Sequence, residues 1–262
     1  MNLLFVIKIG GNVIDDEKAL SSFLDDFAAI KEKKILVHGG GKIATKIGEQ
    51  LGIESKYVNG RRITDAATID LVTMVYGGLV NKKITAQLQS EHCNAIGLTG
   101  ADANILPATK RPVKEVDYGF VGDVDSQELL VSSLELFLEN GFTPVIAPLT
   151  HDGHGQMLNT NADTIASALA VGLSRKYEVR LIYCFEKKGV LEDVSDENSV
   201  IPLITKDIYR QLLAANKLFD GILPKIDNAF SAIDNGVKEV LIGEAKDLIQ
   251  NTGVATKGTL IK

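Results

Sequence analysis

Residues 35–41 read Ile-Leu-Val-His-Gly-Gly-Gly, and this stretch decides the fold. A short apolar run typical of a buried strand ends in three consecutive glycines, and apolar residues four apart follow it: Ile43, Ile47 and Leu51. A spacing of four places these side chains on one face of a helix. The stretch therefore predicts a buried strand that leads through a glycine loop into a helix, the unit from which parallel sheets are built.

The same succession of strand and helix patterns recurs along the chain. Strand patterns occupy 3–9, 34–37, 95–98, 143–147, 179–183 and 239–242, and helix patterns occupy 16–30, 127–139, 163–173 and 226–233. Such alternation predicts an α/β protein whose parallel sheet is covered by helices on both faces. Two segments, 55–64 and 105–124, interrupt the alternation with β-forming, charged and glycine residues, and we expect them to form hairpins at the sheet rim.

The composition excludes several classes of protein. The 262 residues carry a net charge of −6, which disfavours a general surface for nucleic acid or anionic membranes. Cys93 and Cys184 are too few for a disulfide scaffold and lack the C-x-x-C spacing of a zinc site. The apolar run at 3–7 is too short for a signal sequence or for a membrane span of about 20 residues. We therefore expect a cytoplasmic protein without nucleic-acid or membrane partners.

The glycine loop has three interpretations. Residues 39–44 fit the G-x-G-x-x-G/A pattern of dinucleotide-binding folds, but they follow the second strand, and no strand-ending acid lies about 20 residues further on. Residues 38–41 also match the H-G-G-G oxyanion loop of esterases, although the G-x-S-x-G elbow of those enzymes is absent from the sequence. We favour the third interpretation, a loop whose backbone amides bind a carboxylate or a phosphate.

A second glycine cluster follows the first strand pattern. Lys8 lies late in an apolar run, ahead of Gly10 and Gly11. A lysine in that position belongs to the rim of the sheet, where α/β proteins bind ligands, and the glycines let the backbone approach an anion. The plain alternative is an ordinary turn between a strand and a helix, with a solvated lysine.

Three further segments carry residues that suit anion chemistry. Asn159 and Asp163 stand at the start of a helix pattern, where Asn161 suits the N-cap. Arg62 can hold a carboxylate through two parallel hydrogen bonds, and Lys225 follows a proline that suits the first turn of a helix. A cap, a first-turn carboxylate and surface cations explain the same residues structurally, so this pattern alone leaves both interpretations open.

Other nucleotide and metal motifs are absent from the sequence. It contains no G-x-x-x-x-G-K-[ST] phosphate loop and no H-R-D or D-F-G motif of protein kinases. His151 and His154 lie in a glycine-rich turn, but a metal site there would need carboxylate partners that the sequence does not identify. We therefore assign no metal ligand to the chain.

Taken in order, the clusters resemble the amino acid kinase family. The matching segments span nearly the whole chain and read Lys-Ile-Gly-Gly at 8–11, Val-His-Gly-Gly-Gly at 37–41, Asn-Gly-Arg-Arg-Ile-Thr at 59–64, Gly-Phe-Val-Gly-Asp-Val at 119–124, Met-Leu-Asn-Thr-Asn-Ala-Asp at 157–163 and Gly-Ile-Leu-Pro-Lys at 221–225. Each segment is modest by itself, whereas the ordered set is specific. The resemblance implies a three-layer α/β/α sandwich around a mainly parallel sheet, formed by a single domain over 1–262.

The resemblance also implies an activity. The family member that the motifs resemble transfers the γ-phosphoryl group of ATP, with Mg²⁺ carried by the nucleotide, to the side-chain carboxylate of an N-acyl-L-glutamate. The product is an acyl phosphate on the route to arginine, and N-acetyl-L-glutamate is the expected acceptor. The implied N-terminal lobe, roughly 1–155, binds the acyl amino acid, and the implied C-terminal lobe, roughly 156–262, binds ATP.

Site roles follow from the resemblance residue by residue. Lys8 and Lys225 would stabilise the transferring phosphoryl group, and Asp163 would hold both lysines in place. The acylglutamate would be bound by Gly40, Gly41, Arg62 and Asn159. The nucleotide would be bound by Gly10, Gly11, Glu186 and Gly189. A carboxylate is already a nucleophile at neutral pH, so a site of lysines and glycine loops without a recognisable base suits this reaction.

The chain departs from the family pattern at several positions, among them Lys42 and the segment 97–102 near the substrate lobe. Where the family commonly has a Ser-Asp-Val-x-Gly-like run, residues 185–189 read Phe-Glu-Lys-Lys-Gly, so Glu186 stands in place of an aspartate. The sequence also starts directly at its first strand pattern, without the N-terminal helix of hexameric, arginine-inhibited relatives. We therefore expect a homodimer without that feedback.

Other functions remain open at this point. N-succinyl-L-glutamate differs from the acetyl compound by one carboxymethyl unit, and the sequence does not distinguish the two acceptors. Relatives that use carbamate, glutamate or aspartate are the nearest alternatives, and Arg62 and Asn159 together favour an acyl amino acid. A non-catalytic ligand sensor on the same fold is more distant, because Lys8, Asp163 and Lys225 are all present.

Overall fold

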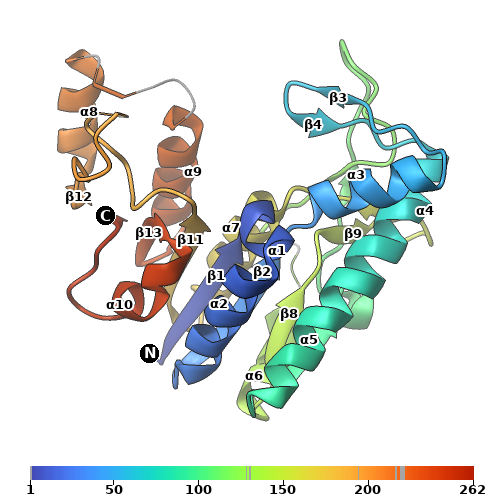
Figure 1. Cartoon of the computed structure of the whole chain (residues 1–262), viewed down its shortest axis with the longest axis horizontal. Coiled ribbons are helices and arrows are strands. Elements are labelled where there is room, and N and C mark those ends of the chain that lie inside the picture. Colours follow the sequence, from blue (N-terminus) through green and yellow to red (C-terminus); the bar gives the residue numbers. More distant parts are fainter. Residues whose placement is uncertain (1, 128, 130, 194, 216, 219–221) are drawn as a thin grey trace. The chain divides into compact units, whose positions relative to one another are not determined.

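The computed structural model describes residues 2–127, 129, 131–193, 195–215, 217–218 and 222–262, and its contacts divide the chain into two compact units. The first unit joins Met1–Ile35 to Ala166–Lys262, and the second is the continuous stretch Leu36–Ile165 (Figure 1). The first unit is discontinuous in sequence because the first strand pairs with a strand from the C-terminal part of the chain. The acceptor-binding and ATP-binding lobes expected at roughly 1–155 and 156–262 stay a prediction.

The first unit contains a five-stranded part of the sheet. Its order is β12 (Leu203–Ile204), β14 (Thr259–Ile261), β13 (Glu239–Glu244), β11 (Glu178–Phe185) and β1 (Leu3–Ile9). The pairs β1–β11, β11–β13 and β12–β14 are parallel, and β13–β14 is antiparallel. Six of the seven residues of β1 are buried, Lys8 among them, which explains the apolar run at 3–7.

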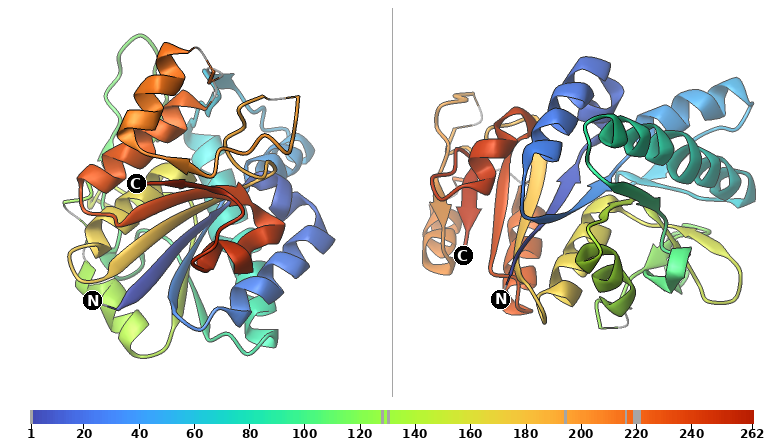
Figure 2. Two further views of the ribbon diagram at one scale, coloured as in Figure 1. Left: turned by 90° about the vertical axis from the view of Figure 1, so that its left-hand side faces the viewer. Right: turned by 90° about the horizontal axis from the view of Figure 1, so that it is seen from below.

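Helices cover both faces of these strands. On one face lie α2 (Glu17–Ala29) and α10 (Leu248–Thr252), and on the other lies α9 (Leu223–Asp234), as Figure 2 shows. The apolar stripe expected for 16–30 is buried in α2 through Leu20, Phe23, Leu24 and Phe27. Full burial of each such side chain stabilises the fold by about 1.5–3 kcal/mol. Asp16 caps α2, because its carboxylate accepts hydrogen bonds from two backbone N–H groups of the first turn.

Three shorter or peripheral helices complete the first unit. They are α1 (Gly11–Asp15), α8 (Lys206–Ala214) and the single 3₁₀ turn η3 (Ala245–Asp247). Helix α7 (Ala162–Leu173) begins in the second unit and ends in the first. Among the helices of the described residues, none is long and apolar enough to cross a membrane.

The second unit is built on β2 (Lys33–His38), β8 (Thr143–Ile146) and β5 (Ala95–Leu98), in that order and all parallel. Helix α5 (Asn81–Ser90) packs against β5 and β8, and α6 (Val131–Glu139) packs against β8 from the opposite face (Figure 2). Helices α3 (Gly41–Gln50), α4 (Ala66–Val72) and η2 (Asp102–Asn104) complete the unit together with the π-helix η1 (Thr73–Val80).

Three antiparallel hairpins project from the second unit. They are β3–β4 (Tyr57–Val58 and Arg61–Arg62), β6–β7 (Thr109–Lys110 and Gly122–Asp123) and β9–β10 (Leu149–His151 and Met157–Asn159). The first two confirm the hairpins expected over 55–64 and 105–124. The third was not expected, and it contains the turn with His151 and His154.

The α/β class, its mainly parallel sheet and all six predicted strands are confirmed. The helical stretch α4–η1–α5 was not predicted, because η1 has apolar residues all around it and two glycines, and so lacks a 3.6-residue pattern. Gly221, which opens the last family motif, lies outside the described residues.

Candidate active site

The glycine loop of the second unit is anchored by a buried histidine. His38 ends β2 and is fully buried, and its Nδ1 lies 2.7 Å from the carbonyl oxygen of Gly39. The Asn81 side-chain N–H₂ donates to the carbonyl of Val145 at 2.9 Å and to His38 Nε2 at 3.1 Å. His38 Nε2 is therefore the acceptor, and its Nδ1–H donates to the loop. Burial lowers the pKa of His38 to about 4, so the ring is neutral at physiological pH.

The neutral state of His38 makes the second unit acid-sensitive. The pKa is about 4 in the folded chain and 6.5 in the unfolded chain, so the unfolded chain binds more protons between those values. The free energy of unfolding therefore falls as the pH drops from about 7 to about 4, by up to about 3 kcal/mol. In urea denaturation series at several pH values, His38→Gln is expected to flatten this dependence. His154→Gln, on an exposed turn, is the control, and an unchanged slope in His38→Gln would contradict the argument.

The two glycines assigned to the substrate differ in their surroundings. Gly40 has a φ of +154°, and a Cβ there would lie 2.9 Å from a ring carbon of Tyr76. A Cβ on Gly41 would meet no described atom within 4 Å. Gly40 is thus required by the close packing of Tyr76, whereas Gly41 opens α3 beside free space, where a ligand can approach the backbone.

Arg62 is tied to the same loop. Its Nη2 donates to the carbonyl of Gly41 at 2.8 Å and to Thr45 Oγ1 at 2.9 Å, and its Nη1 donates to Ser55 Oγ. The guanidinium carbon lies 4.8 Å from the centre of the Tyr57 ring, and only 7% of Arg62 is exposed. This buried arginine therefore joins the β3–β4 hairpin to the first turn of α3.

Asn159 joins three sequence motifs. Its Nδ2 donates to the buried Thr64 Oγ1 at 3.0 Å, and its backbone N–H donates to the carbonyl of Phe120 at 2.9 Å. Gly119 lets the segment next to Phe120 lie against Thr64, because a Cβ there would lie 2.2 Å from the carbonyl oxygen of Thr64. Thr64 is two residues beyond Arg62, so Gly40, Gly41, Arg62 and Asn159 all belong to one connected region of the second unit.

The start of α7 has the capping expected from the sequence. Asn161 Oδ1 accepts the backbone N–H of Asp163 at 2.8 Å and that of Thr164 at 3.2 Å, so Asn161 is confirmed as the N-cap. Asp163 is in the first turn of this helix, where the helix dipole favours a carboxylate.

The first unit brings Lys8 and Lys225 to one aromatic ring. Lys8 is 8% exposed near the end of β1, and its Nζ lies 5.3 Å from the centre of the Phe185 ring. Lys225 is in the first turn of α9, and its Nζ lies 3.7 Å from the same centre. The parallel register of β1 and β11 pairs Lys8 with Tyr183, and so brings the carboxyl ends of both strands together. Two lysines from opposite ends of the sequence therefore contact the same ring.

Three of the four nucleotide-binding candidates have distinct surroundings. A Cβ on Gly10 would lie 4.0 Å from Lys8 Nζ, so this glycine adjoins the lysine pair. Glu186 is exposed directly after Phe185. Gly189 is buried, and a Cβ there would lie 2.6 Å from Thr259 Oγ1, so packing against β14 accounts for this glycine. The fourth candidate, Gly11, is the first residue of α1.

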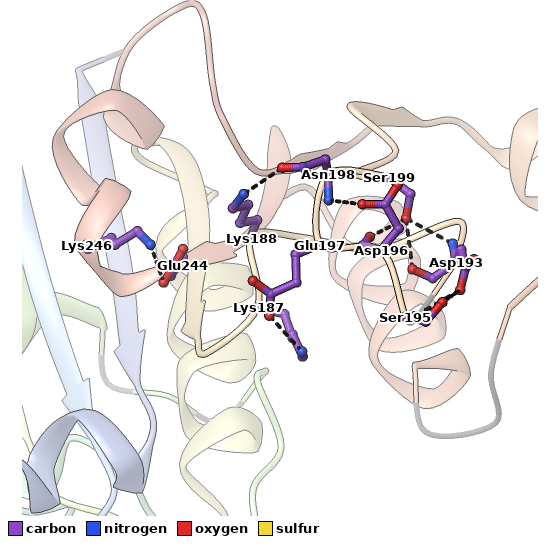
Figure 3. A network of polar contacts seen from close by, with 10 residues as sticks. All are labelled: Lys187, Lys188, Asp193, Ser195, Asp196, Glu197, Asn198, Ser199, Glu244 and Lys246. Atoms are coloured by element: carbon purple, nitrogen blue, oxygen red, sulfur yellow. Dashed lines mark hydrogen bonds and ion pairs between the residues drawn. The ribbon is translucent and has the colours of Figure 1, made fainter.

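The loop after β11, which departs from the family pattern, is held by its own polar contacts (Figure 3). Lys187 pairs with Glu197 at 3.2 Å, and Lys188 Nζ donates to Asn198 Oδ1 at 3.0 Å. Asp193 Oδ1 accepts hydrogen bonds from the backbone and the hydroxyl of Ser195. Exposed pairs of this kind contribute about 0–1 kcal/mol each, so they order the loop more than they stabilise the fold.

Known proteins share this fold. An acetylglutamate kinase of Cytophaga hutchinsonii is 57% identical over 98% of this chain and 98% of its own length, and one of Methanopyrus kandleri is 37% identical over 96% and 99%. A solved structure of N-acetylglutamate synthase from Neisseria gonorrhoeae, complexed with coenzyme A and N-acetyl-glutamate, superposes with a TM-score of 0.81 at 20% identity. The superposition covers 98% of this chain and 59% of the synthase chain.

A solved structure of carbamate kinase from Giardia lamblia bound to AMP-PNP superposes with a TM-score of 0.73 at 13% identity. The superposition covers 98% of this chain and 97% of the carbamate kinase chain. The acetylglutamate kinase relatives identify the chain as a kinase, a phosphotransferase with a carboxyl group as acceptor. The chain belongs to the amino acid kinase family, whose model matches residues 4–244.

Proposed function

We propose that the chain phosphorylates the side-chain carboxylate of N-acetyl-L-glutamate with ATP, in arginine biosynthesis. The observation that carries this proposal is the 57% identity to an acetylglutamate kinase over 98% of both chains. In the reaction a carboxylate oxygen attacks the γ-phosphorus of ATP, the bond to the β,γ-bridging oxygen breaks, and ADP leaves. The product is an acyl phosphate.

The acceptor side of this chemistry is assigned to the second unit. Gly41 offers backbone at the open start of α3, Arg62 offers a guanidinium within the same hydrogen-bonded region, and Asn159 offers an amide. These groups suit the recognition of an amino acid that carries a carboxylate and an N-acyl group. Gly40 supports them by allowing Tyr76 to pack against the loop.

The phosphoryl side is assigned to the first unit. The charge of the transferring group rests on its equatorial oxygens, and two ammonium groups at the ends of β1 and α9 can neutralise it. Gly10 and Gly11 let phosphates approach beside Lys8, and Glu186 and Gly189 belong to the proposed nucleotide region. Asp163 is proposed to orient both lysines. Mg²⁺ arrives with the nucleotide and neutralises part of the phosphate charge.

The test is ADP release from Mg²⁺-ATP with N-acetyl-L-glutamate, N-succinyl-L-glutamate, L-glutamate, L-aspartate and carbamate in parallel. We expect turnover with N-acetyl-L-glutamate. Turnover confined to N-succinyl-L-glutamate would move the proposal to that acceptor. Turnover with another acceptor alone, or nucleotide binding without any turnover, would overturn it.

We further propose that the protein is a cytoplasmic homodimer. Met74 and Leu79 are large apolar side chains that are exposed on the same helix, η1. They offer apolar surface that an interface between copies would bury, and so support the dimer. Light scattering that gives a monomer at assay concentration would contradict the dimer.

A further inference from the structure

Lys8 and Lys225 both contact the ring of Phe185 in the first unit. We infer that Phe185 is a positioning residue for phosphoryl transfer, holding both ammonium groups on its ring. This inference rests on the proposed function, since it concerns the two lysines assigned to the phosphoryl group. In this role Phe185 contacts neither the acceptor nor the reacting atoms, and it acts through the lysines.

The ring is well fixed. Phe185 is the last residue of β11 and is paired with Glu244 of β13, so its backbone belongs to the sheet. The Tyr183 ring stacks with it at 6.0 Å between centres and 22° between planes, and Tyr183 is 5% exposed. A lysine has four rotatable side-chain bonds and a large rotamer entropy, so contact with a fixed ring restricts where its ammonium group lies.

The ring attracts each cation through its quadrupole. It stands at the first position of the segment where the family commonly has a Ser-Asp-Val-x-Gly-like run.

The decisive experiment varies the ring electrostatics at constant shape. Phe185 is replaced in the full-length chain by 4-fluoro-, 3,5-difluoro- and 3,4,5-trifluorophenylalanine, which progressively weaken the quadrupole. We expect kcat to fall stepwise, by about 3- to 30-fold for the trifluoro variant, with the KM for the acceptor and the thermal midpoint almost unchanged. A merely structural ring would give the same kcat across the series, and that result would overturn the inference.

Natural substitutions give an independent check. Phe185→Leu removes the ring but keeps an apolar side chain, and it is expected to lose at least as much kcat as the trifluoro variant. Phe185→Tyr keeps the ring and is expected to restore most of the activity. Phe142→Leu, at a ring that is 37% exposed and packs edge-on against Phe137, is the matched control and should leave kcat unchanged. A leucine variant as active as the tyrosine variant would contradict the inference.

The outcome is separable from failure of the proposed function. If Lys8→Ala and Lys225→Ala both keep normal turnover, the lysines are not part of the site, and the proposed site fails along with this inference. If the lysine variants are inactive while the fluorinated series is flat, only the role of Phe185 is overturned.

Discussion

Lys225→Ala and Lys8→Ala are each expected to lower kcat by about 100-fold or more, because each removes a charge placed in advance against the phosphoryl group. The lysines come from α9 and from β1, and both contact the Phe185 ring, so neither can replace the other from its own position. The measurement is steady-state ADP release with N-acetyl-L-glutamate and ATP, each varied at saturating levels of the other.

Because Lys8 is buried, its substitution needs a control for the loss of side-chain packing. Lys8 is 8% exposed, so alanine also leaves a cavity, whereas Lys8→Met keeps most of the side-chain volume. Both Lys8 variants should lose kcat equally if charge is the cause. Lys206→Ala removes an exposed lysine that pairs with Asp234 at 2.5 Å, and it should change kcat little. Near-normal kcat in the Lys8 and Lys225 variants would show that the site is wrongly assigned.

Arg62→Ala is expected to raise the KM for the acceptor by about 10- to 100-fold, with a smaller effect on kcat, because hydrogen bonds from a charged donor contribute about 1.5–3 kcal/mol. The structure adds a second consequence, since Arg62 also holds Gly41, Thr45 and Ser55. The free energy of unfolding should therefore fall as well, and it is measured by urea denaturation of the same variant.

The adjacent residue provides a matched control for Arg62. Arg61 lies on the same short strand β4 but is exposed, and Arg61→Ala should change neither the KM nor the stability appreciably. Arg62→Lys keeps the charge without the planar fork, so an intermediate KM is expected. If Arg62→Ala lowers stability but leaves the KM unchanged, Arg62 is a brace of the hairpin and not a substrate ligand.

Much of the fold was predictable because strand and helix periods are local properties of the sequence. The strands at 95–98 and 143–147 and the cap at Asn161 follow from side-chain pattern alone, and the structure confirms them. The stretch 66–90 was missed because its π-helical middle is apolar on all sides. The β9–β10 hairpin was not predicted from the sequence.

The candidate site was predictable in its residue types but not in its supports. Gly40, Arg62 and Lys8 stand out as glycine or cation next to strand patterns. Tyr76 and Phe185 do not, because an aromatic residue in an apolar run is usually core. Their roles depend on contacts with residues far away in the sequence, which a single sequence does not record. Gly189 shows the opposite case, a motif glycine that packing already explains.

The pairing of β1 with β11 also determines the order in which the chain can fold as it is made. Leu3 pairs with Glu178, so this pairing of β1 forms only after β11 has been synthesised, although β2, the other neighbour of β1, is made much earlier. At about 5–20 residues per second, that delay is roughly 10 to 35 seconds on the ribosome. The stretch Leu36–Ile165 is continuous and can fold meanwhile. Until β11 has been made, one edge of the apolar strand β1 lacks its neighbour, and an unpaired apolar edge is prone to aggregation.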